Sequence, residues 1–75
     1  MNINTYANFV VDFLIFRKQD FVAGFYTYNP VNMVITFSFL TDKDKSVSYR
    51  VPYATLRKNV IGVTLHILKD RKYEG

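Results

Sequence analysis

Residues 33–51 alternate between large apolar side chains and smaller or polar ones, and this period of two constrains the fold more than any other stretch. Successive side chains of a β-strand point to opposite faces of a sheet, so the period predicts strands with one buried face. The large apolar side chains stand at odd positions: Met33, Ile35, Phe37 and Phe39, then Val47, Tyr49 and Val51. We therefore predict two antiparallel strands joined by a polar turn.

The shared odd numbering also determines how the two strands pair. Residues that lie opposite each other share a face, so an odd residue must pair with an odd residue. The expected pairs are Phe39 with Val47, Phe37 with Tyr49, and Ile35 with Val51. This pairing leaves residues 42–44 as a three-residue loop. The loop contains no glycine, so we expect Asp44 to take the left-handed backbone conformation.

The stretch before this hairpin is predicted to add one strand or two. Residues 21–28 are rich in strand-forming side chains, and Gly24 within them indicates a bulge or a close backbone approach. A turn at 29–32, with Pro30 at its first central position, would place Tyr26 and Tyr28 on the face of the odd-numbered set. Residues 5–18 fit an amphipathic helix, but the run 9–16 is apolar on both sides, and we favour a strand there.

After the hairpin, the chain is expected to form one short helix and a last strand. Proline is tolerated at the first helical position and glycine suits the residue after a helix end, so a helix is predicted between Pro52 and Gly62. Residues 63–68 alternate again and are interpreted as a strand, with His66 on its polar side. The predicted fold is α+β: a small single domain with an antiparallel β-meander of four to five strands and one short helix.

The chain has 75 residues, which fits one domain, 1–75, whose segments 1–8 and 69–75 are expected to be flexible. A chain of this size buries only about 60% of its unfolded surface, so its core is marginal. It contains no cysteine, so neither a disulfide nor a thiolate metal site can reinforce it. Seven phenylalanines and six tyrosines are a large apolar supply for this length. We therefore expect the chain to self-associate.

The net charge of +4 lies entirely in the last third of the sequence, because residues 1–49 contain equal numbers of cations and aspartates. The cations of the last third are Arg50, Arg57, Lys58, Lys69, Arg71 and Lys72. Basic surfaces bind phosphates, and interleaved tyrosines can stack on unpaired bases. These six residues are therefore the candidate nucleic-acid-binding site. The competing interpretation is an ordinary solvated basic face.

The sequence contains no recognisable catalytic pattern. The single histidine, His66, is interpreted as a surface or cross-strand residue and not as a base or metal ligand, because no positioned nucleophile accompanies it. Asp42 and Asp44 alternate with lysines, which indicates a solvated turn and not a cation site. The three glycines form no phosphate-binding loop. We therefore predict no enzymatic activity, no cofactor and no metal.

The predicted function is that of a small accessory or regulatory protein that binds other proteins, as a homo-oligomer such as a homodimer. Tyr26, Tyr28, Tyr49 and Tyr53 are the candidate interface, since tyrosine joins apolar area to a polar tip, although a core position is the alternative for each. The alternative function is a basic nucleic-acid-binding domain that uses residues 50–75.

No targeting segment is expected, since the apolar run 9–16 is interrupted by Asp12 and is far shorter than the roughly 20 residues that a membrane span needs. We expect a cytoplasmic protein without a membrane partner. A small protein rich in lysine, asparagine and aspartate and free of tryptophan and cysteine is also typical of virus and mobile-element accessory proteins, so a viral origin is a further expectation.

Overall fold

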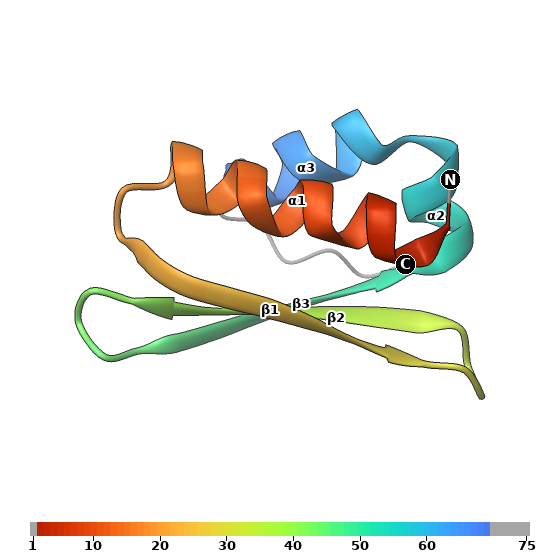
Figure 1. Cartoon of the computed structure of the whole chain (residues 1–75), viewed down its shortest axis with the longest axis horizontal. Helices are drawn as coiled ribbons and strands as arrows, with labels where there is room; N and C mark the ends of the chain where they lie inside the picture. The colour runs from red at the N-terminus through yellow and green to blue at the C-terminus, as the bar shows by residue number, and fades with distance from the viewer. Residues whose placement is uncertain (1, 70–75) are drawn as a thin grey trace.

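In the computed structural model, which describes residues 2–69, the odd-numbered face of the central hairpin is buried beneath a layer of helices (Figure 1). The elements are α1 (Ile3–Arg17), β1 (Phe21–Asn29), β2 (Val34–Thr41), β3 (Ser46–Pro52), α2 (Tyr53–Lys58) and α3 (Val60–Leu68). The three strands form an antiparallel sheet in the order β1-β2-β3. The α+β class is confirmed, but the described residues contain three strands and three helices where four to five strands and one helix were expected.

The central hairpin has the predicted register. Phe39 lies opposite Val47, and the two further predicted pairs follow along β2 and β3. The backbone N–H of Thr41 donates to the carbonyl oxygen of Lys45 at 2.8 Å, which leaves 42–44 as the loop. Asp44 has a φ of 58°, so it takes the left-handed conformation that the pattern required.

The β1–β2 turn differs from the prediction by one residue. It spans 30–33, and the N–H of Met33 donates to the carbonyl oxygen of Asn29 at 2.8 Å. Met33 has a φ of 58° and is exposed, so it belongs to the turn and not to the buried strand face. Tyr26 and Tyr28 nevertheless lie on the expected face, opposite Phe37 and Ile35.

Gly24 marks a close approach between β1 and the core. A Cβ atom at this position would lie 2.6 Å from the Phe39 ring and 3.3 Å from the Ile15 side chain. The irregular pairing of β1 occurs earlier, between Phe21 and Ala23. Of the two interpretations of Gly24, the structure therefore supports the close backbone approach.

The strand predicted within residues 5–18 is wrong, because these residues form most of α1. The side chains that α1 buries follow the helical spacing i, i+3, i+4 and i+7: Ala7, Val10, Val11 and Leu14. Asn2 caps the helix, since its Oδ1 accepts a hydrogen bond from the Thr5 N–H at 3.1 Å. The strand prediction failed because phenylalanines also occupy the outward face of this helix, so its pattern is not clearly amphipathic.

The strand predicted at 63–68 is also wrong, because these residues belong to α3. Asn59 interrupts the expected helix 52–62 and caps α3 by accepting a hydrogen bond from the Gly62 N–H at 3.0 Å. Gly62 therefore lies inside a helix, and Pro52 ends β3. A stretch of six residues fits either period, so its alternation carried little information. Residues 3–8 lie in α1, whereas the tail 70–75 lies outside the described residues.

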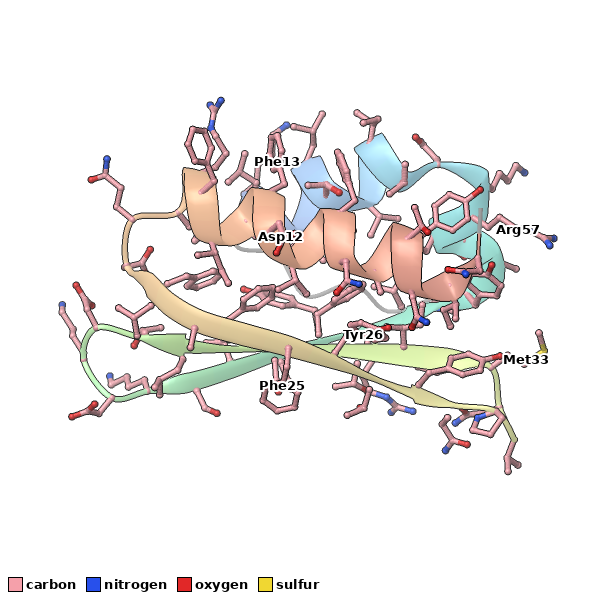
Figure 2. All side chains as sticks on the ribbon, in the orientation of Figure 1. Asp12, Phe13, Phe25, Tyr26, Met33 and Arg57 are labelled. Carbon is pink, nitrogen blue, oxygen red and sulfur yellow. The ribbon has the colours of Figure 1, made fainter. Side chains whose placement is uncertain are left out.

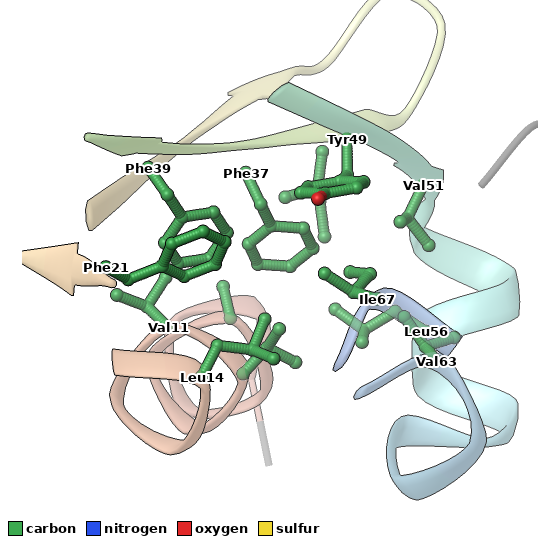
Figure 3. Packing of buried hydrophobic residues seen from close by; sticks show 13 residues of the cluster. Val11, Leu14, Phe21, Phe37, Phe39, Tyr49, Val51, Leu56, Val63 and Ile67 are labelled. Atoms are coloured by element: carbon green, nitrogen blue, oxygen red, sulfur yellow. The ribbon is translucent and has the colours of Figure 1, made fainter. Parts of the chain in front are cut away.

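The hydrophobic core lies between the sheet and the helices α1 and α3 (Figure 3). The rings of Phe21 and Phe39 stack with centroids 4.6 Å apart, and Phe37 is fully buried beside them. Within residues 2–69, all three helices cover the same face of the sheet, and its other face is left open (Figure 1). The molecule therefore has two outer surfaces of different construction, one made of helices and one of strands.

Candidate functional site

The four tyrosines predicted as an interface occupy the helix-covered side of the sheet. Tyr49 is only 3% exposed and belongs to the core. Tyr26, Tyr28 and Tyr53 are half-buried where α1 begins and α2 follows β3. The Tyr53 ring meets Tyr28 and Tyr6 edge-on, with centroids 6.1 and 6.3 Å away.

The Tyr26 hydroxyl adds a link to α1 by donating to Asn4 Oδ1. These tyrosines therefore tie the sheet to α1 and α2, which is a structural role. A role in binding a partner stays a prediction for the half-buried tyrosines.

The predicted cationic set is distributed over several elements. Arg50 lies on the open face of β3, opposite Thr36, whereas Arg57 and Lys58 end α2. Lys69 follows α3, whose nine residues separate it from Lys58 by about 13 Å of helix. The Arg57 guanidinium lies 5.8 Å from the centroid of the Tyr53 ring.

The other two members, Arg71 and Lys72, lie outside the described residues. The described cations thus come from β3, from α2 and from the residue after α3, and their joint action on a nucleic acid stays a prediction.

His66 is half-buried in α3 and not on a strand. Among residues 2–69, no group of three histidine, aspartate or glutamate side chains is placed to hold a metal ion. The acidic turn residues Asp42 and Asp44 are exposed.

The outer surface of the helix layer carries an apolar stripe, which the sequence interpretation missed. Its members are Phe9, Phe13 and Phe16 of α1 and Ile61 and Leu65 of α3, together called the helix stripe. Spacings of four and three residues place the three phenylalanines on one side of α1, away from its buried side chains. Phe16 is 81% exposed and Ile61 is 56% exposed. Figure 2 shows Phe13 directed away from the sheet.

Aromatic rings of the helix stripe contact one another and a neighbouring cation. The rings of Phe9 and Phe13 stack with centroids 5.8 Å apart, and the Arg17 guanidinium lies 5.8 Å from the Phe13 centroid. Asp12 is exposed on the same outward side of α1. The described helix α1 contains these two charged residues, of opposite sign, and α3 contains no aspartate, glutamate, lysine or arginine.

The open side of the strands forms the second surface, called the open sheet face. Phe25 projects from β1 on the side opposite the helices and is 61% exposed (Figure 2). Its row continues through Ser38 to Ser48, whose hydroxyl oxygens lie 3.3 Å apart. The row on one side of Phe25 contains Thr27, Thr36 and Arg50. The row on the other side of Phe25 contains Leu40, which is 41% exposed.

A signal for Phe25 was present in the sequence. Tyr26 and Tyr28 were assigned to the buried face, so the odd-numbered residues of the same strand had to point the opposite way. Phe25 was therefore the one large aromatic residue of 21–29 directed at the open face. For the helix stripe, the spacing of positions 9, 13 and 16 would have been informative only after the helix was recognised.

Comparison of the chain with known protein families, curated proteins and solved structures gives no match. None of the helices within residues 2–69 is long and apolar enough to cross a membrane. Any functional conclusion therefore rests on the two surfaces themselves.

Proposed function

We propose that this chain is a small non-enzymatic accessory or regulatory protein that acts by protein–protein contacts and forms a homodimer through the helix stripe. The observation that carries the proposal is the exposure of several large apolar side chains on α1 and α3, among them Phe16, Ile61 and Leu65. Burying one large apolar side chain contributes about 1.5–3 kcal/mol. Contiguous exposed apolar patches mark interaction surfaces, whereas single exposed side chains do not. The stacked rings of Phe9 and Phe13 join two members of the helix stripe.

The size of the helix layer supports a small partner. The 15 residues of α1 span about 22 Å, and two adjacent helices are about 20 Å wide. A standard interface buries about 800 Å² on each partner, so this surface is at or below the usual size. We therefore expect a dimer that dissociates in the micromolar range, with a second copy as the partner.

The sequence of α1 is also self-complementary about a two-fold axis. In a two-fold contact, residue i meets residue j and residue j meets residue i. If two α1 helices pack antiparallel with the axis between positions 14 and 15, Phe13 of one copy meets Phe16 of the other. The same axis brings Asp12 to the level of Arg17 of the second copy, with the two charges at the two edges of the aromatic contact. One arrangement thus pairs the aromatic rings and places opposite charges at the same level of the contact, where they attract across it.

Sedimentation equilibrium over a micromolar concentration series tests the dimer. Phe16→Ser should raise the dissociation constant at least tenfold, because it removes the most exposed ring of the helix stripe. Val31→Ser is the matched control, since Val31 is 91% exposed in the β1–β2 turn, away from the helix stripe. A strictly monomeric wild-type protein, or equal effects of both substitutions, would contradict the proposal.

A charge exchange tests the antiparallel arrangement separately. Asp12→Arg and Arg17→Asp should each weaken the dimer, because each places like charges opposite one another. The double variant D12R/R17D should recover affinity, because it restores opposite charges with their positions exchanged. If the double variant is weaker than both single variants while the wild type dimerises, the dimer exists but uses another arrangement.

A further inference from the structure

The open sheet face combines an accessible aromatic ring with a cation and with small hydroxyl side chains. Ser38 and Ser48 extend the row of Phe25 across the sheet, and neither is long enough to cover its ring. The two serine hydroxyls are within hydrogen-bonding distance of each other at 3.3 Å. The Phe25 ring is therefore accessible beside short polar side chains.

The charge of this face is of one sign. The described strands β1, β2 and β3 contain no aspartate or glutamate, and their one charged residue is Arg50. Arg50 is exposed on the row next to that of Phe25. A cationic face without carboxylates complements a polyanion better than it complements an average protein surface.

The spacing between the ring and the cation suits a nucleotide chain. Phe25 and Arg50 stand two strands apart and one row apart, which places their Cα atoms about 12 Å from each other. An arginine side chain is long enough to span part of this separation. A base lying on the ring could therefore have a backbone phosphate at the guanidinium.

We infer that the open sheet face binds single-stranded nucleic acid, with Phe25 stacking on an unpaired base and Arg50 contacting a phosphate. Exposed aromatic rings in a positively charged setting are the common means of holding single strands without sequence preference. The hydroxyls of Thr27 and Thr36, in the Arg50 row, add hydrogen-bonding groups for the sugar and phosphate. The helix stripe lies on the opposite side of the molecule, so dimerisation leaves this face accessible (Figure 1).

The test is fluorescence anisotropy of a labelled oligothymidine strand with the full-length chain at low and moderate salt. Phe25→Thr should weaken binding about fivefold or more, because stacking on one base is lost. Phe25→Tyr should bind like the wild type, since it keeps the ring. Both variants should fold normally because Phe25 is largely exposed, and circular dichroism checks this.

Arg50→Gln should weaken binding and reduce the slope of log affinity against log salt by about 0.7, the value for one phosphate contact on a single strand. Arg57→Gln removes the same charge from α2 and should change binding much less. The inference is overturned if the strand does not bind at low salt or if Phe25→Thr binds as tightly as the wild type. It is also overturned if Arg57→Gln matches Arg50→Gln, or if duplex DNA competes as well as the single strand.

Discussion

The two outer surfaces of this molecule share one core but expose different chemistry. The helix stripe exposes several large apolar side chains, and α1 adds one acid and one base, Asp12 and Arg17. The open sheet face exposes Phe25 and Leu40 among small hydroxyl side chains, with Arg50 as its charge. We propose that the first surface contacts a second copy of the chain and that the second binds an anion.

The difference arises from how each element divides its side chains between core and solvent. A strand alternates strictly, so β2 and β3 place their aromatic residues on one face and, apart from Leu40 and Arg50, keep short side chains on the other. A helix has a wide outer face, and the sheet needs only a narrow stripe of α1 for packing. The additional phenylalanines of α1 therefore point outward. This contrast suggests that excess aromatic residues on the helices serve contacts outside the monomer.

The largest effect is expected from a substitution in the hydrophobic core, which supports both surfaces. Phe37 is fully buried between the sheet and the helices, so Phe37→Ala should destabilise the fold by about 3–5 kcal/mol. Both the dimer and the nucleic-acid complex should be lost, since each needs the folded core. Urea unfolding measures the free energy. If either binding activity survives in an unfolded variant, that surface does not depend on the fold described above.

A smaller effect is expected where β1 approaches the core. Gly24→Ala would place a Cβ atom 2.6 Å from the Phe39 ring, so the ring or the strand must shift, at a cost of about 1–3 kcal/mol. Because Gly24 adjoins Phe25, the open sheet face should be perturbed more than the helix stripe. The comparison is made by thermal unfolding and amide chemical shifts, with Ala23→Ser, an exposed neighbour, as the control. An undisturbed Phe39 environment would refute the close approach.

Removing the N-cap of α3 should lower the free energy of unfolding by about 1 kcal/mol. The loss should affect the helix side of the molecule alone. Asn59→Ala removes the oxygen that accepts the Gly62 N–H, so α3 loses its N-cap. Dimerisation should weaken because α3 carries Ile61 and Leu65, whereas binding at the open sheet face should be retained. Asn59→Asp keeps an accepting oxygen and should restore most of the stability. Equal losses at both surfaces would mean that they are coupled through the fold.

The salt dependence of binding should distinguish the two surfaces without any substitution. Binding of a single strand at the open sheet face should weaken steadily with salt, because phosphate contacts release counterions. The dimer should respond weakly, because its energy comes from apolar burial and an exposed ion pair contributes only about 0–1 kcal/mol. Dissociation constants measured in the same salt series test both expectations. A dimer that weakens as steeply as the nucleic-acid complex would show that charge, and not the phenylalanines, holds it.

The sequence alone determined the central hairpin, from its register to the left-handed Asp44. This was possible because alternation is a local property: a shift of one residue would invert every side chain of the strand. The same parity implied the outward direction of Phe25. The sequence also excluded disulfides, through its lack of cysteine.

Only the tertiary structure decided what residues 5–18 and 63–68 become. The run 9–16 and the segment 63–68 are short and largely apolar, so neither helical nor strand periodicity prevails within them. The sheet favoured helices in both segments, because its apolar face has to be covered by a second layer and a helix can pack across several strands. The same layer determined which sheet face stays open. It also determined that the cations Arg50, Arg57 and Lys69 are separated, the first in β3, the second in α2 and the third after α3.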